Sequence, residues 1–414
     1  MLDNFFTTFA FMNKLKIIND PIYGFITIPS ELIFDIIEHK YFQRLRRISQ
    51  MGMSYLVYPG AHHTRFQHAI GCTFLMQKAV QVLKFKGISI SKKEEEALII
   101  AILLHDIGHG AFSHALEHSI VNDISHEEIS LKFMEVLNKE FNGKLSLAIE
   151  IFKGNHPRKF FNQLISSQLD IDRLDYLKRD SFYTGVAEGN VNSERLITML
   201  NVVNNELVVE EKGIYSVEKF IIARRLMYWQ VYLHKTGLVA ENVLVKVLQR
   251  AKQLSSQGVN LEASKPLDFF LNTKINNKNF DNKVLNTFAQ LDDYDIISAI
   301  KSWQSHNDLV LSTLSKAIIQ RKLPKILLQN EKISIDYSKK IKSDIKTKFS
   351  INNDELSYFV IEGKVSNHAY SVEKSPINIL FKNGELKDIV QASDHLNLKA
   401  LTKPVVKHYI YYSK

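Results

Sequence analysis

The stretch Leu103–His118, LLHDIGHGAFSHALEH, decides the fold, because it places four histidines directly after an apolar segment. The run Ala97–Leu104 (ALIIAILL) predicts a buried helix, which ends at His105 and Asp106 before two glycines. Polar groups at a buried helix end are costly unless they find partners. A divalent ion bound by imidazole nitrogen and carboxylate oxygen is one solution, and a hydrogen-bonded capping pair is the other.

Two further polar motifs lie on either side of this stretch. The segment His62–His68 (HHTRFQH) precedes it, and Leu169–Tyr176 (LDIDRLDY) follows it. A His, a His-Asp pair and an Asp on three helical regions are able to converge on one ion, as metal sites in helical bundles do. The spacing alone leaves both interpretations open, a shared metal site and separate capping residues.

The sequence on both sides of these motifs is patterned mainly as helix. Between residues 30 and 320, apolar residues recur at spacings of three and four. Pro and Gly number only 8 and 16, which suits helices joined by short connections. The clearest helical segments are Glu94–Leu104, His126–Phe141, Leu164–Arg179 and Val217–Gln249.

Strand patterns gather near the two ends of the chain. Ser357–Glu362 and Val405–Tyr412 are rich in β-branched and aromatic residues. Asn383-Gly384, within Ile377–Ile389, predicts a two-residue hairpin turn, and Lys16–Ile28 predicts another short hairpin. We therefore predict a mainly α protein with a leader and hairpin at 1–29, a helical domain at 30–320 and a smaller α+β region at 321–414.

The composition describes a globular chain without disulfides. Its 414 residues are 45% hydrophobic and 23% charged, which excludes an intrinsically disordered chain. The one cysteine, Cys72, cannot form an internal disulfide, so a reducing compartment, the cytoplasm, is expected. The longest apolar run is far shorter than the roughly 20 residues that a bilayer requires, and the N-terminus lacks signal-peptide features. We therefore expect no membrane association.

The order of the polar motifs resembles that of the HD-domain metal-dependent phosphohydrolases. The surrounding residues are most similar to the deoxynucleoside triphosphate triphosphohydrolase branch of that family, and the similarity runs from about Lys16 to at least Lys235. It implies an HD-domain helical bundle core. The matching segments are Asn19–Gly24 (NDPIYG), Phe42–Arg46 (FQRLR), Tyr58–Ala61 (YPGA), Arg65–His68 (RFQH), His105–Gly110 (HDIGHG), Phe112–His114 (FSH) and Asp170–Tyr176 (DIDRLDY).

The resemblance implies one divalent metal ion held by His68, His105, Asp106 and Asp172. Two imidazoles and two carboxylates leave positions open for water and a phosphate oxygen, so that the ion polarises phosphorus and lowers the pKa of water. Iron, manganese, magnesium and zinc are all compatible with these ligand types, although Mg²⁺ fits imidazole least well.

The resemblance also implies catalytic and substrate-binding residues. Release of a deoxynucleoside requires a proton for the leaving oxygen, which a histidine held by a carboxylate can supply. The positions that match catalytic residues are His109 and His114, with Glu117 and His126 as partners of His109. Those that match phosphate contacts are Arg65, Arg173, Arg224 and Lys235, and those around the deoxyribose are Gln50, Met51, Tyr176, Asp180 and Tyr232.

Departures from the family pattern occur at four positions, one of which is Glu38, where an Asp is usual. Met51 stands where a Leu is usual, Gln67 where a Glu is usual and Tyr23 where a His is usual. Met is softer than Leu, which bears on selectivity against ribonucleotides. Gln67 removes a negative charge close to the metal ligands, which bears on metal preference.

The resemblance further implies regulation and assembly. Some members are activated by nucleotides bound between subunits, and the matching positions here are Lys16, Asn19, Glu38, Gln43 and Arg46. A homodimer or homotetramer is therefore expected. The substrate of the chain would be a nucleotide.

Three functions remain in contention at this point. The first is hydrolysis of dNTPs to deoxynucleoside and inorganic triphosphate. The second is HD-type hydrolysis of another phosphoester, such as a nucleoside monophosphate or a cyclic dinucleotide. The third is nucleic-acid binding by Arg321–Lys348, which holds nine Lys and Arg against three Asp and Glu in a chain of net charge +9. We rank the third lowest, because few aromatic residues are interleaved there.

Overall fold

The computed structural model describes residues 16–113, 116, 119, 124–373, 375–394 and 398–413. It is mainly α-helical, as the sequence predicts, with a few small sheets. In the described residues no helix combines the length and the apolar character that crossing a membrane requires. The limits of the three predicted domains stay predictions.

The first part of the chain forms a hairpin and the helices that carry the polar motifs. Strands β1 and β2 pair antiparallel from Ile17↔Thr27 to Asp20↔Gly24, where Gly24 has a φ of +74°. This confirms the hairpin expected at Lys16–Ile28. The elements are β1 (Ile17–Asp20), β2 (Gly24–Thr27), α1 (Glu31–Glu38), α2 (Lys40–Gln43), the 3₁₀ turns η1 (Arg44–Arg47) and η2 (Gly52–Leu56), α3 (Arg65–Phe85) and α4 (Lys92–Leu104).

Helix α3 is the centre of this part of the molecule. It packs against α4, α9 and α10, and its residues Ala69, Leu75 and Met76 are fully buried. The elements that surround and follow it are α6 (His126–Glu140), α7 (Ser146–Phe152), α8 (Lys159–Ile165), α9 (Ile171–Thr184), η3 (Ala187–Gly189), α10 (Ser193–Thr198), β3 (Leu200–Val203), β4 (Glu206–Glu210), η4 (Glu211–Gly213), α11 (Ile214–Met227) and the π-helical turn η5 (Tyr228–Tyr232).

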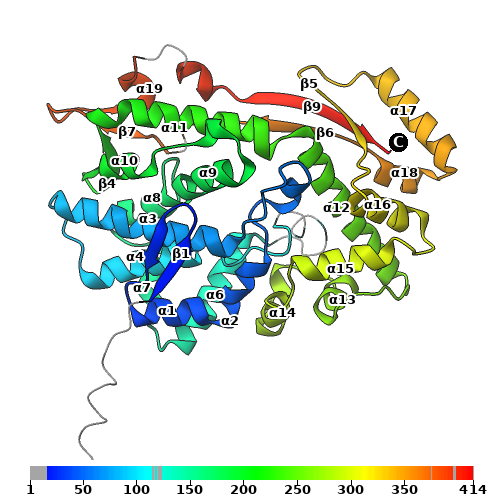
Figure 1. Cartoon of the computed structure of the whole chain (residues 1–414), viewed down its shortest axis with the longest axis horizontal. Coiled ribbons are helices and arrows are strands. Elements are labelled where there is room, and N and C mark those ends of the chain that lie inside the picture. Colours follow the sequence, from blue (N-terminus) through cyan, green and yellow to red (C-terminus); the bar gives the residue numbers. More distant parts are fainter. Residues whose placement is uncertain are drawn as a thin grey trace, which may run out of the picture.

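A second group of helices lies beside the first (Figure 1). Helix α12 leads into it and packs against α13 and α16. Its elements are α12 (Lys235–Ser256), α13 (Lys265–Asn272), η6 (Asn277–Asn279), α14 (Asn282–Phe288), α15 (Asp293–Trp303) and α16 (Leu309–Ile319).

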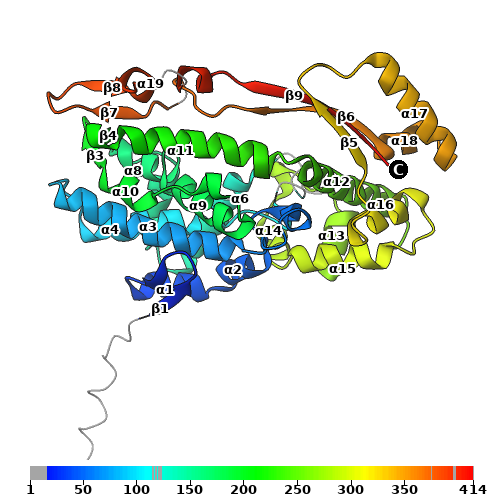
Figure 2. The same cartoon turned by 45° about the horizontal axis from the view of Figure 1, so that its top comes forward.

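The C-terminal elements form a long layer over both groups of helices (Figure 2). The sheet β5-β9-β6 is antiparallel, and α17 and α18 lie at one end of it. At the other end β7 pairs parallel with β4, so that β7 and β8 extend the sheet β3-β4-β7-β8. The elements are β5 (Lys325–Gln329), α17 (Ile335–Phe349), α18 (Asn353–Phe359), β6 (Val360–Asn367), β7 (Asn378–Leu380), β8 (Leu386–Asp388), α19 (Ile389–Ala392), η7 (Leu398–Thr402) and β9 (Val405–Tyr412).

Several expected elements differ from the observed ones. Leu164–Arg179 is two helices, α8 and α9, because Asp170 caps the start of α9 through the backbone N–H of Arg173. Val217–Gln249 is interrupted by the π-helical turn η5 before α12. Ser357–Glu362 begins as helix α18 and continues as strand β6.

The two turns near strands also differ from expectation. Asn383-Gly384 does not form a two-residue turn: β7 and β8 are joined by five residues between Leu380 and Leu386, with Gly384 at a φ of +86°. The hairpin β3–β4 falls in the region expected to be helical. Its turn, Asn204-Asn205, has positive φ at both residues, 51° and 66°, which matches the twist of the adjoining strands.

Candidate metal centre and active site

Three helices deliver the polar motifs to one place. His68 lies in the first turn of α3, whose N-terminus is closed by a capping box between Thr64 and Gln67. His105 is the C-cap of α4, and Asp106 follows it. Asp172 lies in the first turn of α9. The two helix starts and the helix end therefore face the same point.

The four side chains of this set approach one another closely. His68 Nε2 lies 3.1 Å from Asp172 Oδ1 and 3.8 Å from Asp106 Oδ2. His105 Nε2 lies 3.5 Å from both Asp106 Oδ1 and Asp172 Oδ1. Ligand atoms about 2.1 Å from one ion stand roughly 3 Å apart on neighbouring positions. These separations fit donors arranged around a common centre.

The donor chemistry of the set also fits a cation. His105 is buried, and its Nδ1 donates to the carbonyl of Ile102 at 2.6 Å, which leaves Nε2 as the acceptor. Within the residues that the structure describes, this Nε2 makes no hydrogen bond. A buried nitrogen with a free lone pair facing two carboxylates is suited to a metal ion.

The charges around these donors lead to the same conclusion. Ion pairs extend the set of four ligand side chains into a larger cluster: Arg65 pairs with Asp106, Asp175 pairs with His68, and Arg179 joins Asp175 to Asp20. This cluster holds four carboxylates and two guanidinium groups, an excess of two negative charges that one divalent ion would balance.

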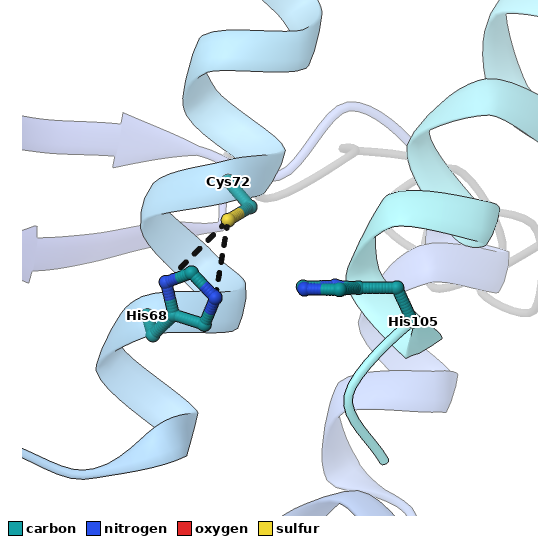
Figure 3. Close-up of side chains that lie close together, drawn as sticks. All are labelled: His68, Cys72 and His105. Atoms are coloured by element: carbon teal, nitrogen blue, oxygen red, sulfur yellow. Dashed lines mark hydrogen bonds between the residues drawn. The ribbon is translucent and has the colours of Figure 1, made fainter. Parts of the chain in front are cut away.

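Cys72 lies next to this centre on the following turn of α3 (Figure 3). Its Sγ is 3.6 Å and 3.7 Å from the two ring nitrogens of His68, so the sulfur packs against the imidazole, and His105 points toward the pair from α4. Burial raises the pKa of the Cys72 thiol strongly. A protonated thiol is a poor ligand, and we interpret Cys72 as packing for His68.

His109 lies directly beside the ligand set. It is buried, its Nδ1 is 3.4 Å from Asp106 Oδ1, and its ring stacks on that of His126 at a centroid distance of 3.9 Å. Arg65 donates to Asp106 and, at 3.0 Å and 2.8 Å, to the hydroxyl of Ser113. His114 and Glu117, the other two expected catalytic residues, lie outside the described residues.

Buried contacts hold the loop that carries His109. Arg44 Nη2 donates to the carbonyls of Ile107 and His109 at 3.1 Å and 2.6 Å. A Cβ on Gly108 would meet the carbonyl of His126 at 2.0 Å, so only glycine lets the loop approach α6 this closely. The loop is therefore fixed from two sides.

The next residues of the loop are strained. Phe112 and Ser113 both have a φ of +48°, a conformation that costs a non-glycine residue free energy and that clusters at functional sites. Asp293, from α15, accepts the N–H of Phe112 at 2.7 Å and that of Ser49 at 2.8 Å. Burial raises the pKa of Asp293 to about 6.

The arginines expected to contact phosphate lie on α9 and α11. Arg173 pairs with Asp170, and Arg224 lies 6.0 Å from the Tyr228 ring centroid. In each, the Nε is buried and lacks a hydrogen-bond partner among the described residues. Both guanidinium groups therefore retain donors for an anion. Lys235 is exposed at the start of α12.

The residues expected around the deoxyribose form a connected polar group. Asp180 accepts from Tyr232 at 2.7 Å and lies 2.7 Å from His63 Nε2. The rings of Tyr176 and Tyr232 meet edge to face at 6.1 Å. Gln50 donates its N–H to the carbonyl of His63 at 3.0 Å. The adjoining Met51 is buried, and the Oε1 of Gln50 is buried without a partner in the described part of the chain.

Two of the expected regulatory residues, Lys16 and Gln43, contact helix α1. The ammonium of Lys16 lies 4.1 Å from the Phe34 ring centroid, and Gln43 donates to the carbonyl of Ile37 at 2.8 Å. Arg46 donates to Gln43 at 2.9 Å. Asn19 and Glu38 are exposed.

Sequence reasoning missed several residues that hold this site. His63 and Asp175 lie inside the quoted motifs but received no role, Arg179 ends the helical segment Leu164–Arg179, and Asp20 lies in the matching segment Asn19–Gly24. Their function becomes visible only when the helices are packed. Arg44 lies close to two further arginines and Asp293 lies beside Asp292, so no local pattern marks either residue as buried, although both are.

Comparison with known proteins agrees with this geometry. Residues 65–180 match the HD domain, and residues 191–280 match the HD associated region. An uncharacterized protein of Bacillus subtilis, YwfO, is 32% identical over 97% of this chain and 93% of its own length. The chain belongs to the HD-domain phosphohydrolases. It is an enzyme of that superfamily, as the motifs predict.

Two solved structures are similar to this HD-domain phosphohydrolase over nearly the full length of the chain. A phosphohydrolase from Bacteroides thetaiotaomicron is 52% identical, with a TM-score of 0.94 over 97% of this chain and 100% of that chain. A hypothetical protein from Aquifex aeolicus is 28% identical, with a TM-score of 0.73 over 96% of both chains.

Two curated relatives carry a substrate in their names. The deoxynucleoside triphosphate triphosphohydrolase SAMHD1 homolog of Dictyostelium discoideum is 28% identical over 95% of this chain and 82% of its own length. The human deoxynucleoside triphosphate triphosphohydrolase SAMHD1 is 28% identical over 57% of this chain and 45% of its own length.

Proposed function

We propose that this HD-domain phosphohydrolase cleaves dNTPs to deoxynucleoside and inorganic triphosphate, with one divalent ion held by His68, His105, Asp106 and Asp172. The observation that carries the proposal is the buried, unpartnered Nε2 of His105, which faces two carboxylates 3.5 Å away. The names of the two triphosphohydrolase relatives support the substrate class.

The chemistry divides between the ion and the protein. When bound, the ion polarises the α-phosphorus centre and lowers the pKa of an attacking water. His109 donates a proton to the departing 5′ oxygen, which would otherwise leave as an alkoxide. Asp106 and His126 hold the imidazole of His109 in place, through the 3.4 Å contact and the ring stack.

The remaining residues bind the two ends of the nucleotide. Arg173 and Arg224 direct their unpartnered Nε donors to triphosphate oxygens. Asp180 accepts a hydrogen bond from the sugar's 3′-hydroxyl, while Tyr232, which already donates to Asp180, fills the space that a 2′-hydroxyl would need. This arrangement favours deoxyribose over ribose.

Product analysis tests this proposal. Metal-loaded protein is incubated with the four dNTPs, with and without GTP, for each of Fe²⁺, Mn²⁺, Mg²⁺ and Zn²⁺. We expect deoxynucleoside and triphosphate from the wild type and none from a His105→Ala/Asp106→Ala variant. A requirement for GTP would support regulation at the expected regulatory residues.

A matched control comes from a second His–carboxylate pair. His39 Nε2 lies 3.0 Å from Glu140 Oε2, outside the site, so His39→Ala/Glu140→Ala should retain activity. Orthophosphate release from a nucleoside monophosphate, or opening of a cyclic dinucleotide to its linear form, would identify another substrate class if the dNTPs stay intact. Absence of turnover on every phosphoester would contradict the proposal.

A further inference from the structure

A continuous series of buried hydrogen bonds connects the N-terminal hairpin to His68. His68 Nδ1 lies 2.7 Å from Asp175 Oδ2. Arg179 donates to both oxygens of Asp175, from Nε at 2.9 Å and from Nη2 at 3.0 Å. Its remaining Nη1 donates to Asp20 Oδ2 at 2.8 Å. The series passes through α3, α9 and the end of strand β1.

Every side chain in this series is buried and fixed. His68, Asp175 and Arg179 are fully inaccessible, and Asp20 is 3% exposed. The other oxygen of Asp20 accepts the N–H groups of Ile22 and Tyr23 at 2.9 Å and 3.0 Å, which closes the hairpin turn. Asp20 is thus held by the backbone of one element while it holds the guanidinium of another.

These bonds determine how His68 presents its second nitrogen. Because Asp175 accepts a hydrogen bond from Nδ1–H, the neutral imidazole keeps its lone pair on Nε2. That Nε2 is the atom 3.1 Å from Asp172. The Arg179 fork prevents rotation of the Asp175 carboxylate and compensates its charge in the buried interior. The orientation of His68 therefore depends on Arg179, and that of Arg179 on Asp20.

We propose that Arg179 and Asp20 are positioning residues for the metal centre, so that the N-terminal hairpin holds His68 in its ligand orientation. This inference rests on the metal ligands assigned under the proposed function. It does not depend on which phosphoester is cleaved. The alternative is that the series only stabilises the packing of the hairpin on α9.

Binding of Mn²⁺ alone separates these two possibilities. Asp20→Asn keeps an oxygen for the turn but replaces the carboxylate facing Arg179 with an amide. We expect the Mn²⁺ dissociation constant, from titration followed by electron paramagnetic resonance, to rise about 3- to 10-fold. Asp175→Asn, in direct contact with His68, should raise it about 10- to 100-fold. The visible spectrum of bound Co²⁺ should also change in both variants, and it should change more in Asp175→Asn than in Asp20→Asn.

Asp308→Asn provides the matched control. Asp308 also pairs with an arginine, Arg250, and also accepts a backbone N–H, that of Leu311 at 2.8 Å, but it caps α16, outside the series. We expect this variant to lose thermal stability with an unchanged Mn²⁺ dissociation constant and Co²⁺ spectrum. If Asp20→Asn behaves in the same way, the positioning role is refuted.

A measurement on the wild type avoids any dependence on folded variants. Coupling between two sites is reciprocal, so an ion that needs the hairpin must also stabilise it. We expect Mn²⁺ to slow amide hydrogen exchange in residues 17–27, relative to protein treated with a chelator. Exchange in strands β5 and β9 should slow less than exchange in the hairpin, because there only the overall stabilisation of the fold by the ion acts. Equal exchange in the hairpin with and without bound Mn²⁺ would overturn the inference.

The two proposals fail in distinguishable ways. If Mn²⁺ binds and the hairpin responds while every dNTP stays intact, the positioning role stands and the substrate assignment is wrong. If dNTPs are cleaved but Asp20→Asn binds Mn²⁺ as the wild type does, the substrate stands and the positioning role is wrong.

Discussion

Gly71 of α3 lies directly against the side chains of Asp175 and Arg179 on α9. A Cβ at this position would lie 2.1 Å from Arg179 Nη2 and 2.1 Å from Asp175 Oδ1. Neither side chain can move away, because both are buried and hydrogen-bonded. We expect Gly71→Ala to lower the free energy of unfolding by about 1–3 kcal/mol, through overpacking and disturbance of the ion pair. Urea denaturation measures this loss.

A second helical glycine supplies the control for that substitution. A Cβ added to Gly237, in the first turn of α12, would meet no atom of the described residues within 4 Å, and the φ of Gly237 is not positive. Gly237→Ala should therefore stabilise the protein by about 0.4–1 kcal/mol, because alanine restricts the unfolded chain. Equal effects of the two substitutions would contradict the close contact at Gly71.

Asp293 gives the stability of the fold a dependence on pH. Its folded pKa of about 6 exceeds the usual value of about 3.9, because burial outweighs the hydrogen bonds from Ser49 and Phe112 and because the charge of Asp292 adds to it. The folded state favours the neutral carboxyl. The contribution of Asp293 to the free energy of unfolding is therefore fully present below pH 4 and is lost as pH rises through 6. Arg44 and Tyr55 also face this carboxylate.

A comparison with Asp293→Asn isolates this contribution, since asparagine does not titrate. The unfolding free energy of the variant minus that of the wild type should increase by about 1 kcal/mol between pH 5 and pH 7, and then level off. Urea denaturation at half-unit pH steps measures it. A difference that stays constant over this range would show that Asp293 titrates normally.

At the scale of elements, Gln168 joins the C-terminal strands to the start of the helix that carries Asp172. Its amide donates to the carbonyls of Ser371 and Ser375 at 2.6 Å and 2.5 Å and accepts the N–H of Ser371 at 2.8 Å. Strand β7 pairs with β4 beside this contact. Gln168→Ala leaves three backbone groups unpaired, and we expect a loss of about 1–3 kcal/mol with faster amide exchange in β7.

Gln257→Ala serves as the control for the Gln168→Ala substitution. Gln257 is exposed at the end of α12, so its removal should change stability by less than about 0.5 kcal/mol. If the loss for Gln168→Ala also falls within this limit, the hydrogen bonds of Gln168 to Ser371 and Ser375 contribute nothing measurable to the free energy of unfolding. Exchange in β9 should rise less than exchange in β7 in Gln168→Ala, and it should stay at the wild-type rate in Gln257→Ala.

The sequence predicted single elements and motifs better than their junctions. Val405–Tyr412 is a strand over the expected residues, and the three polar motifs meet as the family resemblance implied. The break before α9 is not evident from the sequence, because Leu169 lies four residues after Ile165 and keeps the helical spacing, although the other residues of Ser166–Asp170 are polar. Asn204-Asn205 is a hairpin signal that the surrounding helical pattern outweighed. The roles of Arg179 and Asp20 depend on residues 159 positions apart, which no local pattern reveals.

At the scale of the whole molecule, the excess of negative charge at the metal centre makes the stability of the fold depend on whether a divalent ion is bound. An ion that binds only the folded chain stabilises it by RT ln(1 + [M]/Kd), about 2.7 kcal/mol at 100 times Kd. For an unfolding entropy of about 2.1 cal/mol/K per residue, a chain of 414 residues should gain roughly 3 °C in Tm. Calorimetry of chelator-treated protein, with and without Mn²⁺, measures this gain.

The same calorimetry on His105→Ala/Asp106→Ala tests where the stabilising ion binds. This variant removes two of the four proposed ligands, so Mn²⁺ should no longer raise its Tm. His39→Ala/Glu140→Ala, which removes a His–carboxylate pair elsewhere, should keep the full gain. A gain of the same size in all three proteins would place the stabilising ion outside the centre formed by α3, α4 and α9. A gain confined to the wild type and the control would tie the stability of the whole fold to that one site.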